Sequence, residues 1–307
     1  MKKRFNFGLL ISHLMLAALV GMIFFAPKKR SDLDPTALLV ALAIVELLFL
    51  WSVFKKIRKK QSLKGCADII IIVWAFMIAW EIACSVMGHL NPVVFPTPEK
   101  TFEIFITYRN SLLKHVWYSM KLLAIGLGIG VSTAVILGVI CAWVPRLRSF
   151  SYPIANVMAP IPPVVFSPYL IIIMSSFRAA SIMIVVLGVF WSTFMNTFQN
   201  VQGIDKRTID SAKMLNLNNW EMIFTILLPS VMPAVLNRLK ITLTTSLLML
   251  NFAEMMGANA GIGFFICNAT AFANYEQTIA GIILSGVVVT ILNKLATLAQ
   301  KHALRWK

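Results

Sequence analysis

Residues that could carry out chemistry are few and scattered in this 307-residue sequence. It contains four histidines and four cysteines. The cysteines form no C-x-x-C pair, and none stands at a metal-ligand spacing from a histidine. No G-x4-G-K-[ST] sequence that would bind a nucleotide is present. We therefore predict no catalytic, metal or cofactor site in this chain, and a membrane-embedded enzyme, which needs clustered reactive residues, is disfavoured.

One ionisable pair is placed by helix geometry. His13 lies eight residues from the start of the apolar run 5–26, and Glu46 lies eight residues from the end of the run 36–54. At a rise of about 1.5 Å per residue, two antiparallel helices would hold both side chains roughly 12 Å deep. An unpaired carboxylate at that depth is costly. We predict that His13 and Glu46 are hydrogen-bonded and hold the two helices together, rather than carry protons.

The elements that would position these residues are membrane-spanning helices. The sequence is 59% hydrophobic and 13% charged, too apolar for a soluble domain with one polar surface. Long apolar runs predict an all-α, polytopic integral membrane protein with about eight transmembrane helices. The expected spans are 5–26, 36–54, 66–87, 112–141, 150–175, 179–200, 231–253 and 276–296.

Charge predicts the topology. The net charge is +16, but the basic residues form short tracts in alternate loops and no basic-aromatic groove, so nucleic acid is not an expected partner. Most lysines and arginines fall on the side that holds both termini, which the positive-inside rule makes cytoplasmic. The tract Lys28-Lys29-Arg30 is the exception. The basic linker 55–64 divides an N-terminal hairpin, 1–60, from the main transmembrane domain, 61–307.

Residues 205–229 form a semi-polar segment among the apolar runs. Asp205 or Thr208 is expected to cap a short helix that ends at Asn216, a residue that tolerates the left-handed conformation. Asn218 and Glu221 have the spacing of a capping box for a second short helix. Pro229 is expected to close that helix. An amphipathic helix lying on lipid is the simpler alternative.

This segment resembles a motif of the membrane permeases of binding-protein-dependent ABC importers, E-A-A-x3-G-x9-I-x-L-P. The match is gapless, with Asp, Ser and Asn replacing Glu, the first Ala and Gly. Further similarity to the nitrate, sulfonate and taurine branch lies in Phe95-Pro-Thr-Pro, His115 with Ser119, Pro160-Ile-Pro-Pro, and Ala253-Glu254 with Gly261-Ile-Gly. The matching coupling residues are Asp210, Ser211, Ala212, Asn216, Leu217, Ile226, Leu228 and Pro229.

The resemblance implies a type I importer core in the cell (inner or plasma) membrane, preceded by the two-helix extension. It implies that ABC ATPase subunits dock on residues 205–229, and that ATP and magnesium belong to those subunits. It also implies two permease copies around one path, as a homodimer embedded in lipid, and an extracytoplasmic binding protein that delivers the solute.

Two further sets of residues are candidates for the path and its gate. The prolines at 160–163 would break a helix, which a bilayer tolerates only beside protein or a water-filled cavity. Glu254, expected to be an exposed acid, precedes a glycine-rich turn that permits close backbone approach, so we expect it, Asn259 and Gly261 at an outer gate or at the binding-protein contact. The candidates for the path are Pro160, Pro162, Pro163, Phe166, Met174 and Ser175.

The substrate is left open by the sequence. The resembling branch handles small oxyanions and sulfonates such as nitrate and taurine, but its pattern extends to cyclic nitrogenous nutrients such as thiamine precursors, pyrimidines or riboflavin. No lysine or arginine falls between Pro160 and Ser175, which argues against tight binding of a bare anion in that stretch. An ion-coupled secondary transporter is the alternative mechanism, but it would need ionisable residues along its substrate path.

Overall fold

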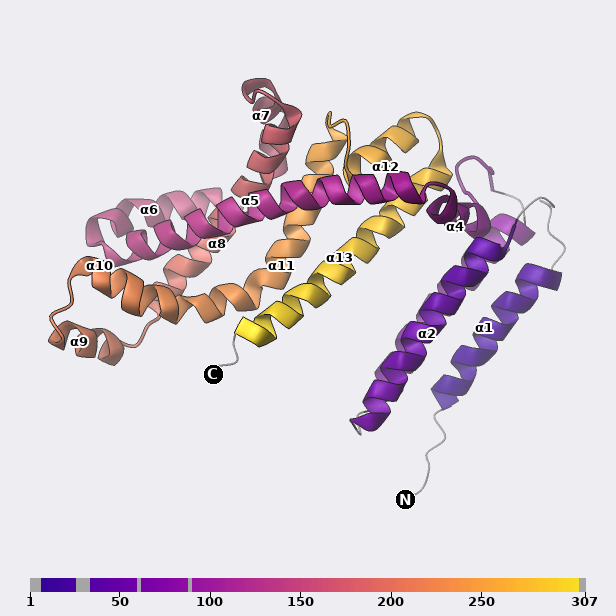
Figure 1. Ribbon diagram of the computed structural model, residues 1–307, viewed down its shortest axis with the longest axis horizontal. Coiled ribbons are helices and arrows are strands. Elements are labelled where there is room, and N and C mark those ends of the chain that lie inside the picture. Colours follow the sequence, from indigo (N-terminus) through magenta and orange to yellow (C-terminus); the bar gives the residue numbers. More distant parts are fainter. Residues whose placement is uncertain (1–6, 26–33, 60–61, 88–89, 304–307) are drawn as a thin grey trace, which may run out of the picture. The chain divides into compact units, whose positions relative to one another are not determined.

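The computed structural model describes residues 7–25, 34–59, 62–87 and 90–303, and it contains helices and no strand in these ranges (Figure 1). The tract Lys28-Lys29-Arg30, named above as the exception in the topology, lies outside the described ranges, as do Lys2, Lys3 and Arg4 near the N-terminus. The chain divides into two compact units, residues 1–112 with 269–280, and residues 113–268 with 281–307.

The first unit contains α1 (Phe7–Phe25), α2 (Thr36–Arg58), α3 (Lys64–Glu81) with the π-helical turn η1 (Ile82–Val86), and α4 (Pro98–Thr107). Trp74 of α3 is fully buried, and it packs with Leu19 of α1 and Leu42 of α2 in one hydrophobic cluster. The third helix thus shares the core of the N-terminal hairpin. This unit therefore extends beyond the boundary that the sequence predicted near residue 60.

The second unit is built on the long helices α5 (Arg109–Trp143), α8 (Phe177–Gln202), α11 (Leu228–Met255) and α13 (Tyr275–Ala303). Leu122 of α5, Val185 of α8, Leu247 of α11 and Val288 of α13 meet in one buried cluster. Glycines bring α5 close to α8, because a Cβ on Gly126 would lie 2.6 Å from the side chain of Val185. In lipid no hydrophobic effect drives helices together, so they associate through close van der Waals packing, which small residues such as glycine allow. The remaining elements are α6 (Pro145–Met158), η2 (Pro163–Phe166), α7 (Ser167–Ile173), α9 (Lys206–Met214), α10 (Asn219–Glu221), η3 (Met222–Leu227) and α12 (Ile262–Ala271).

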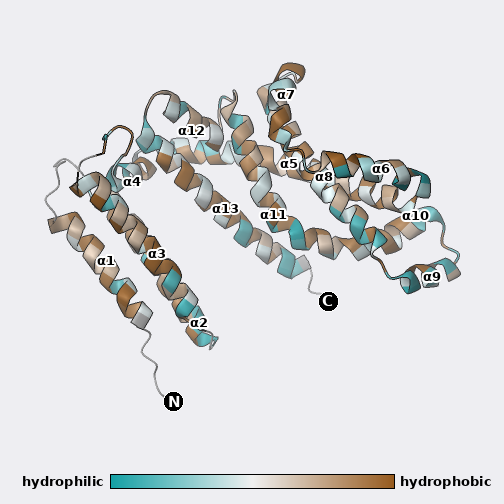
Figure 2. Ribbon diagram, turned by 180° about the vertical axis from the view of Figure 1, so that it is seen from behind, coloured by the Kyte–Doolittle hydropathy of each residue, from teal (hydrophilic) through white to brown (hydrophobic). Residues whose placement is uncertain are grey.

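Seven described helices are long and apolar enough to cross a membrane, and a bent pair brings the number to eight if it counts as one span. That pair, Pro145–Met158 with Pro163–Ile173, is bent by 85° and occupies the place of the expected span 150–175. The prolines between the two parts explain the break, since each removes an amide donor and its ring clashes with the preceding turn. In Figure 2 the long helices are mainly brown, whereas α9 carries teal, hydrophilic residues.

Candidate functional site

The polar segment 205–229, called the coupling segment below, begins as the sequence predicted. The Asp205 carboxylate accepts a hydrogen bond of 3.0 Å from the Arg207 amide and caps α9. Asn216 adopts the left-handed conformation, with φ of 53°, and turns the chain. Asn218 and Glu221 form the predicted capping box, with reciprocal bonds of 2.9 and 2.8 Å. These three local predictions are confirmed.

The helix that follows does not close at Pro229, so this prediction was wrong. A continuous helical stretch runs from Asn219 to Met255. Residues Met222–Leu227 form a π-helical turn, whose wider spacing changes the hydrogen-bond register just before the proline. The Ser230 hydroxyl donates a hydrogen bond of 2.6 Å to the carbonyl of Ile226, so this carbonyl has a side-chain partner. Proline is thus accommodated near the start of α11 instead of ending a helix.

One face of the coupling segment is anchored to the rest of its unit. Ala212, Met222 and Leu227 are buried in a cluster with Phe198 of α8 and Ala142 of α5. Ala212 is only 4% exposed. Among the predicted coupling residues, Leu217, Ile226 and Leu228 are half-buried against the same cluster. These four residues, Ala212, Leu217, Ile226 and Leu228, anchor the segment to the rest of the unit.

The opposite face is exposed and partly apolar. Met214 is 85% exposed, Leu215 72%, Trp220 63% and Phe224 50%. The rings of Trp220 and Phe224 stack with their centroids 6.1 Å apart. The sequence analysis did not single out these four residues, although large apolar side chains beside a helix-ending asparagine were a visible signal. The predicted residues Asp210, Ser211, Asn216 and Pro229 are exposed as well.

The predicted path residues are only partly brought together. Pro163 and Phe166 line a cavity of about 170 Å³ with Leu187 and Trp191 of α8. Pro163 also lies against Gly188, where a Cβ would come within 3.4 Å of the proline ring. The other candidates do not line this cavity. They are Pro160, Pro162 and Ser175, which are exposed, and Met174, which is half-buried.

Glu254 is fully buried, which contradicts the expectation of an exposed acid. Its Oε1 accepts a 2.7 Å hydrogen bond from the hydroxyl of Ser119 on α5, and its Oε2 accepts one of 2.9 Å from the Gly263 amide. Ser119 in turn accepts from the Ile262 amide at 2.9 Å, and His115 Nδ1 accepts from the Gly261 amide at 3.1 Å. The motif residues thus satisfy the free amides at the start of α12.

This cluster, formed by His115, Ser119, Glu254 and the amides of residues 261–263, encloses the Glu254 carboxylate, which is therefore not exposed. Gly261 is buried in it and has φ of +123°, a conformation that other residues rarely adopt. A Cβ there would collide with the Glu254 carboxyl group. Asn259, the third predicted residue, is exposed on the preceding loop.

In the first unit, His13 and Glu46 lie as predicted. His13 Nδ1 is 2.9 Å from Glu46 Oε1, and the imidazole ring contacts Phe49 edge-on at 6.2 Å between centroids. The side chain of His13 is 47% exposed and that of Glu46 14%. The predicted contact is confirmed, and whether it serves the cohesion of the hairpin stays a prediction.

Within the described ranges, no three His, Cys, Asp or Glu residues come together in a way that could hold a metal ion.

The family model of the binding-protein-dependent transport system inner membrane component matches residues 134–306. A permease of Bacillus subtilis (strain 168) named for aliphatic sulfonate transport is 24% identical over 82% of this chain and 92% of its own length. The taurine transport system permease protein of Escherichia coli (strain K12) is 22% identical over 79% of this chain and 88% of its own length. The nitrate import permease protein of a Synechocystis species is 23% identical over 73% of this chain and 84% of its own length.

Among solved structures, a bacterial ABC transporter involved in the import of the acidic polysaccharide alginate aligns with a TM-score of 0.59 and 16% identity, covering 83% of this chain and 99% of the other. A chain of the MetNI methionine ABC transporter aligns with a TM-score of 0.56 and 16% identity, and the alignment covers 64% of this chain and 97% of the other. At these identities the likeness concerns the fold.

Proposed function

The chain belongs to the family of binding-protein-dependent transport system inner membrane components, and from that premise we propose that its coupling segment is the docking site of a separate ATPase. As a member of the family, the chain is the membrane permease of an ABC importer. In the proposal, the partner ATPase binds ATP and magnesium and hydrolyses the nucleotide, and its motion reaches the permease through the coupling segment.

The observation that carries this proposal is the two-sided character of the coupling segment. Ala212 and Leu227 are anchored in the core, while Met214, Leu215 and Trp220 are exposed on a folded, capped structure. Burial of a large apolar side chain contributes about 1.5–3 kcal/mol. Exposed side chains of this size on a segment held rigidly from behind are suited to a groove in a protein partner. A segment that only lay on lipid could bury these apolar side chains as a simple amphipathic helix and would not need a capped turn.

The remaining partners follow from the same membership. We propose a second copy of this chain as the other half of the path, and a binding protein on the side opposite the ATPase. The coupling segment carries Lys206, Arg207 and Lys213 on exposed positions. By the positive-inside rule these residues support a cytoplasmic coupling segment and cytoplasmic termini in the cell membrane.

For the substrate, we propose a small oxyanion of the sulfonate, taurine or nitrate type. The support is that three relatives that align over most of this chain are named for aliphatic sulfonates, taurine and nitrate.

The test of docking is co-purification with the ATPase expressed beside this chain, comparing wild type with Leu215→Glu. The added charge on a 72% exposed docking residue should abolish co-purification and uptake while the permease stays folded. Ser149→Glu adds the same charge at an exposed position of α6 and should leave both intact. Full co-purification and uptake in Leu215→Glu would refute docking on this face.

A further inference from the structure

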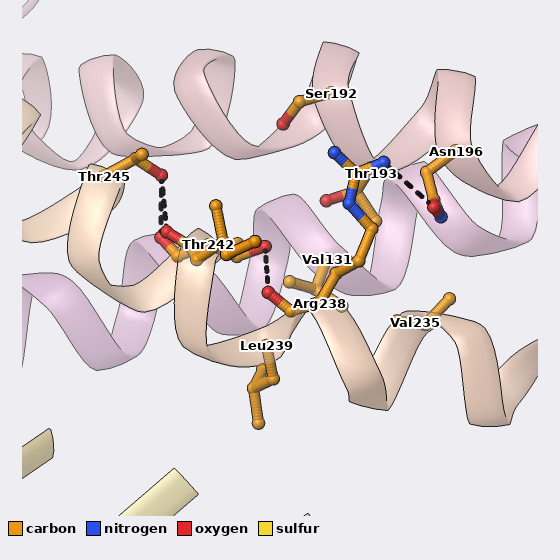
Figure 3. A pocket seen from close by; sticks show the side chains of 10 residues that line it. Val131, Ser192, Thr193, Asn196, Val235, Arg238, Leu239, Thr242 and Thr245 are labelled. Carbon is orange, nitrogen blue, oxygen red and sulfur yellow. Dashed lines mark hydrogen bonds between the residues drawn. The ribbon is translucent and has the colours of Figure 1, made fainter. Parts of the chain in front are cut away.

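A polar cavity of about 120 Å³ lies in the second unit among α5, α8 and α11 (Figure 3). This volume is well above the roughly 10–15 Å³ that one water molecule needs by the same measure. Four hydroxyl side chains and Arg238 line it together with the side chain of Asn196. The lining residues are Val131, Ser192, Thr193, Asn196, Val235, Arg238, Leu239, Ile241, Thr242 and Thr245.

Arg238 is the cationic group of this cavity. It lies on α11, within the expected span 231–253, and is exposed in the isolated chain. A charged side chain in a span faces protein or a water-filled cavity, because lipid solvates it poorly. One guanidinium nitrogen donates 3.0 Å to Asn196 Oδ1 (Figure 3). A guanidinium has five N–H groups in a fork that matches planar or three-oxygen anions.

Asn196 adds an unused donor. Its Oδ1 accepts from Arg238 and, at 3.3 Å, from Asn200 Nδ2. Two donors on this oxygen fix the other amide atom, Nδ2, as the N–H₂ group. The residue is only 8% exposed, and Nδ2 has no hydrogen-bond partner. A buried donor without a partner is costly, so an acceptor that enters the cavity would gain a hydrogen bond here.

The rest of the lining favours an anion as well. None of the ten lining residues is acidic. The hydroxyls of Ser192, Thr242 and Thr245 now donate to backbone carbonyls one turn away, at 3.2, 3.2 and 3.0 Å. They can rotate toward a stronger acceptor, since a hydroxyl hydrogen turns to suit its surroundings.

We propose that this cavity is a contact site for the oxyanion group of the transported solute, with Arg238 and Asn196 Nδ2 as its principal donors. The inference rests on the proposed oxyanion substrate and adds the place where the permease itself holds it. It also accounts for anion passage without a basic residue in the proline-rich stretch 160–175. A single arginine with few fixed donors binds weakly, as a site in a path must if the solute is to leave.

The probe is methanesulfonate, and its uncharged analogue methanesulfonamide is the matched control. The melting temperature of the purified permease–ATPase complex, without binding protein, is measured in detergent up to about 0.1 M probe against sodium chloride of equal ionic strength. Ligand binding to the folded state raises the melting temperature, and the rise grows with the ratio of ligand concentration to Kd. Wild type should rise by a few degrees with methanesulfonate and should not respond to methanesulfonamide.

Variants locate the response. Arg238→Gln should lose it, Asn196→Ala should reduce it, and Arg238→Lys, which keeps the charge, should retain part of it. Arg146→Gln removes an arginine from an exposed position of α6 and should respond as wild type does. Basal ATP hydrolysis reports whether each complex is intact. If Arg238→Gln does not assemble, Asn196→Ala and Arg238→Lys still decide the question.

An equal response of wild type to both probes, or an unchanged response in Arg238→Gln or Asn196→Ala, would overturn the site. A rise in melting temperature with a short-chain anionic phospholipid that is lost in Arg238→Gln, together with no response to methanesulfonate, would assign the cavity to lipid headgroups and would also overturn the site. Uptake of methanesulfonate by proteoliposomes that contain the whole importer is measured separately. Uptake without a site-dependent shift refutes only this inference, whereas absence of oxyanion uptake refutes the proposed substrate.

Discussion

The hydroxyl of Ser119 lies 2.7 Å from the Glu254 carboxylate although the two residues are 135 positions apart in the sequence. This bond joins α5 to the end of α11, and the same two side chains hold the amides of Ile262 and Gly263 at the start of α12. Three helices are therefore tied at one buried point.

Removal of the Glu254 carboxylate should destabilise the protein. In Glu254→Gln one of the two carboxylate oxygens is replaced by an NH₂ group. Either the Ser119 hydroxyl or the Gly263 amide, each of which now donates to one of these oxygens, then loses its acceptor. The expected loss is about 1–3 kcal/mol, seen as a lower melting temperature in detergent. Glu276→Gln, which alters a half-buried pair with Lys100 at 3.4 Å, should change it little. Equal effects of the two changes would contradict the central role of Glu254.

Gly261→Ala should be more damaging than an alanine at a glycine with open space around it. The added Cβ would collide with the carboxyl group of Glu254. The alanine would also have to adopt a φ of +123°, which residues with a side chain rarely do. We expect a loss of about 1–3 kcal/mol from overpacking alone. Gly128→Ala in α5 is the matched control, because nothing lies within 4 Å of its added Cβ. The measurement is the thermal midpoint of both variants, and a tolerant Gly261→Ala would show that the loop can move away from Glu254.

A substitution at Ala212 should act through folding rather than through docking. Ala212 is 4% exposed and lies in the cluster that anchors the coupling segment. Ala212→Arg should therefore increase proteolysis of the segment and lower the yield of folded permease. Ser211→Arg, at the exposed neighbouring position, should leave proteolysis and yield unchanged. Limited proteolysis of the purified permease distinguishes the two, and equal protection of both variants would contradict the anchoring.

The contact between His13 and Glu46 predicts a pattern of single and double substitutions. Loss of one partner leaves the other without its hydrogen bond inside the membrane, so His13→Leu and Glu46→Leu should each lower the melting temperature. The double variant places two apolar residues face to face and should recover much of the loss. Additive losses would show that the two side chains do not act as a pair.

The local features of the coupling segment could be predicted because they depend on neighbours in the chain. The cap at Asp205, the left-handed Asn216 and the capping box from Asn218 to Glu221 each involve residues within three positions. The pair of His13 and Glu46 was accessible too, since helical rise sets depth and two long apolar helices leave few places for a carboxylate.

Features that depend on packing between distant elements could not be read in the same way. The burial of Glu254 depends on Ser119, far away in the chain, so the acid looked like an exposed helix end. Pro229 looked like a helix end because proline usually is one, but the π-helical turn before it changes the local register. The buried side of Ala212 and the position of Arg238 beside Asn196 likewise require the packing of α8 against its neighbours.

The π-helical turn keeps one long helix unbroken. Because it lets the helix pass Pro229 without ending, the stretch from Asn219 to Met255 is helical throughout its 37 residues, although it bends along its course (Figure 1). Its first turn carries the capping box, and its last turn carries Glu254. Trp220 and the point where three helices are tied therefore lie on one unbroken helix, with no loop between them.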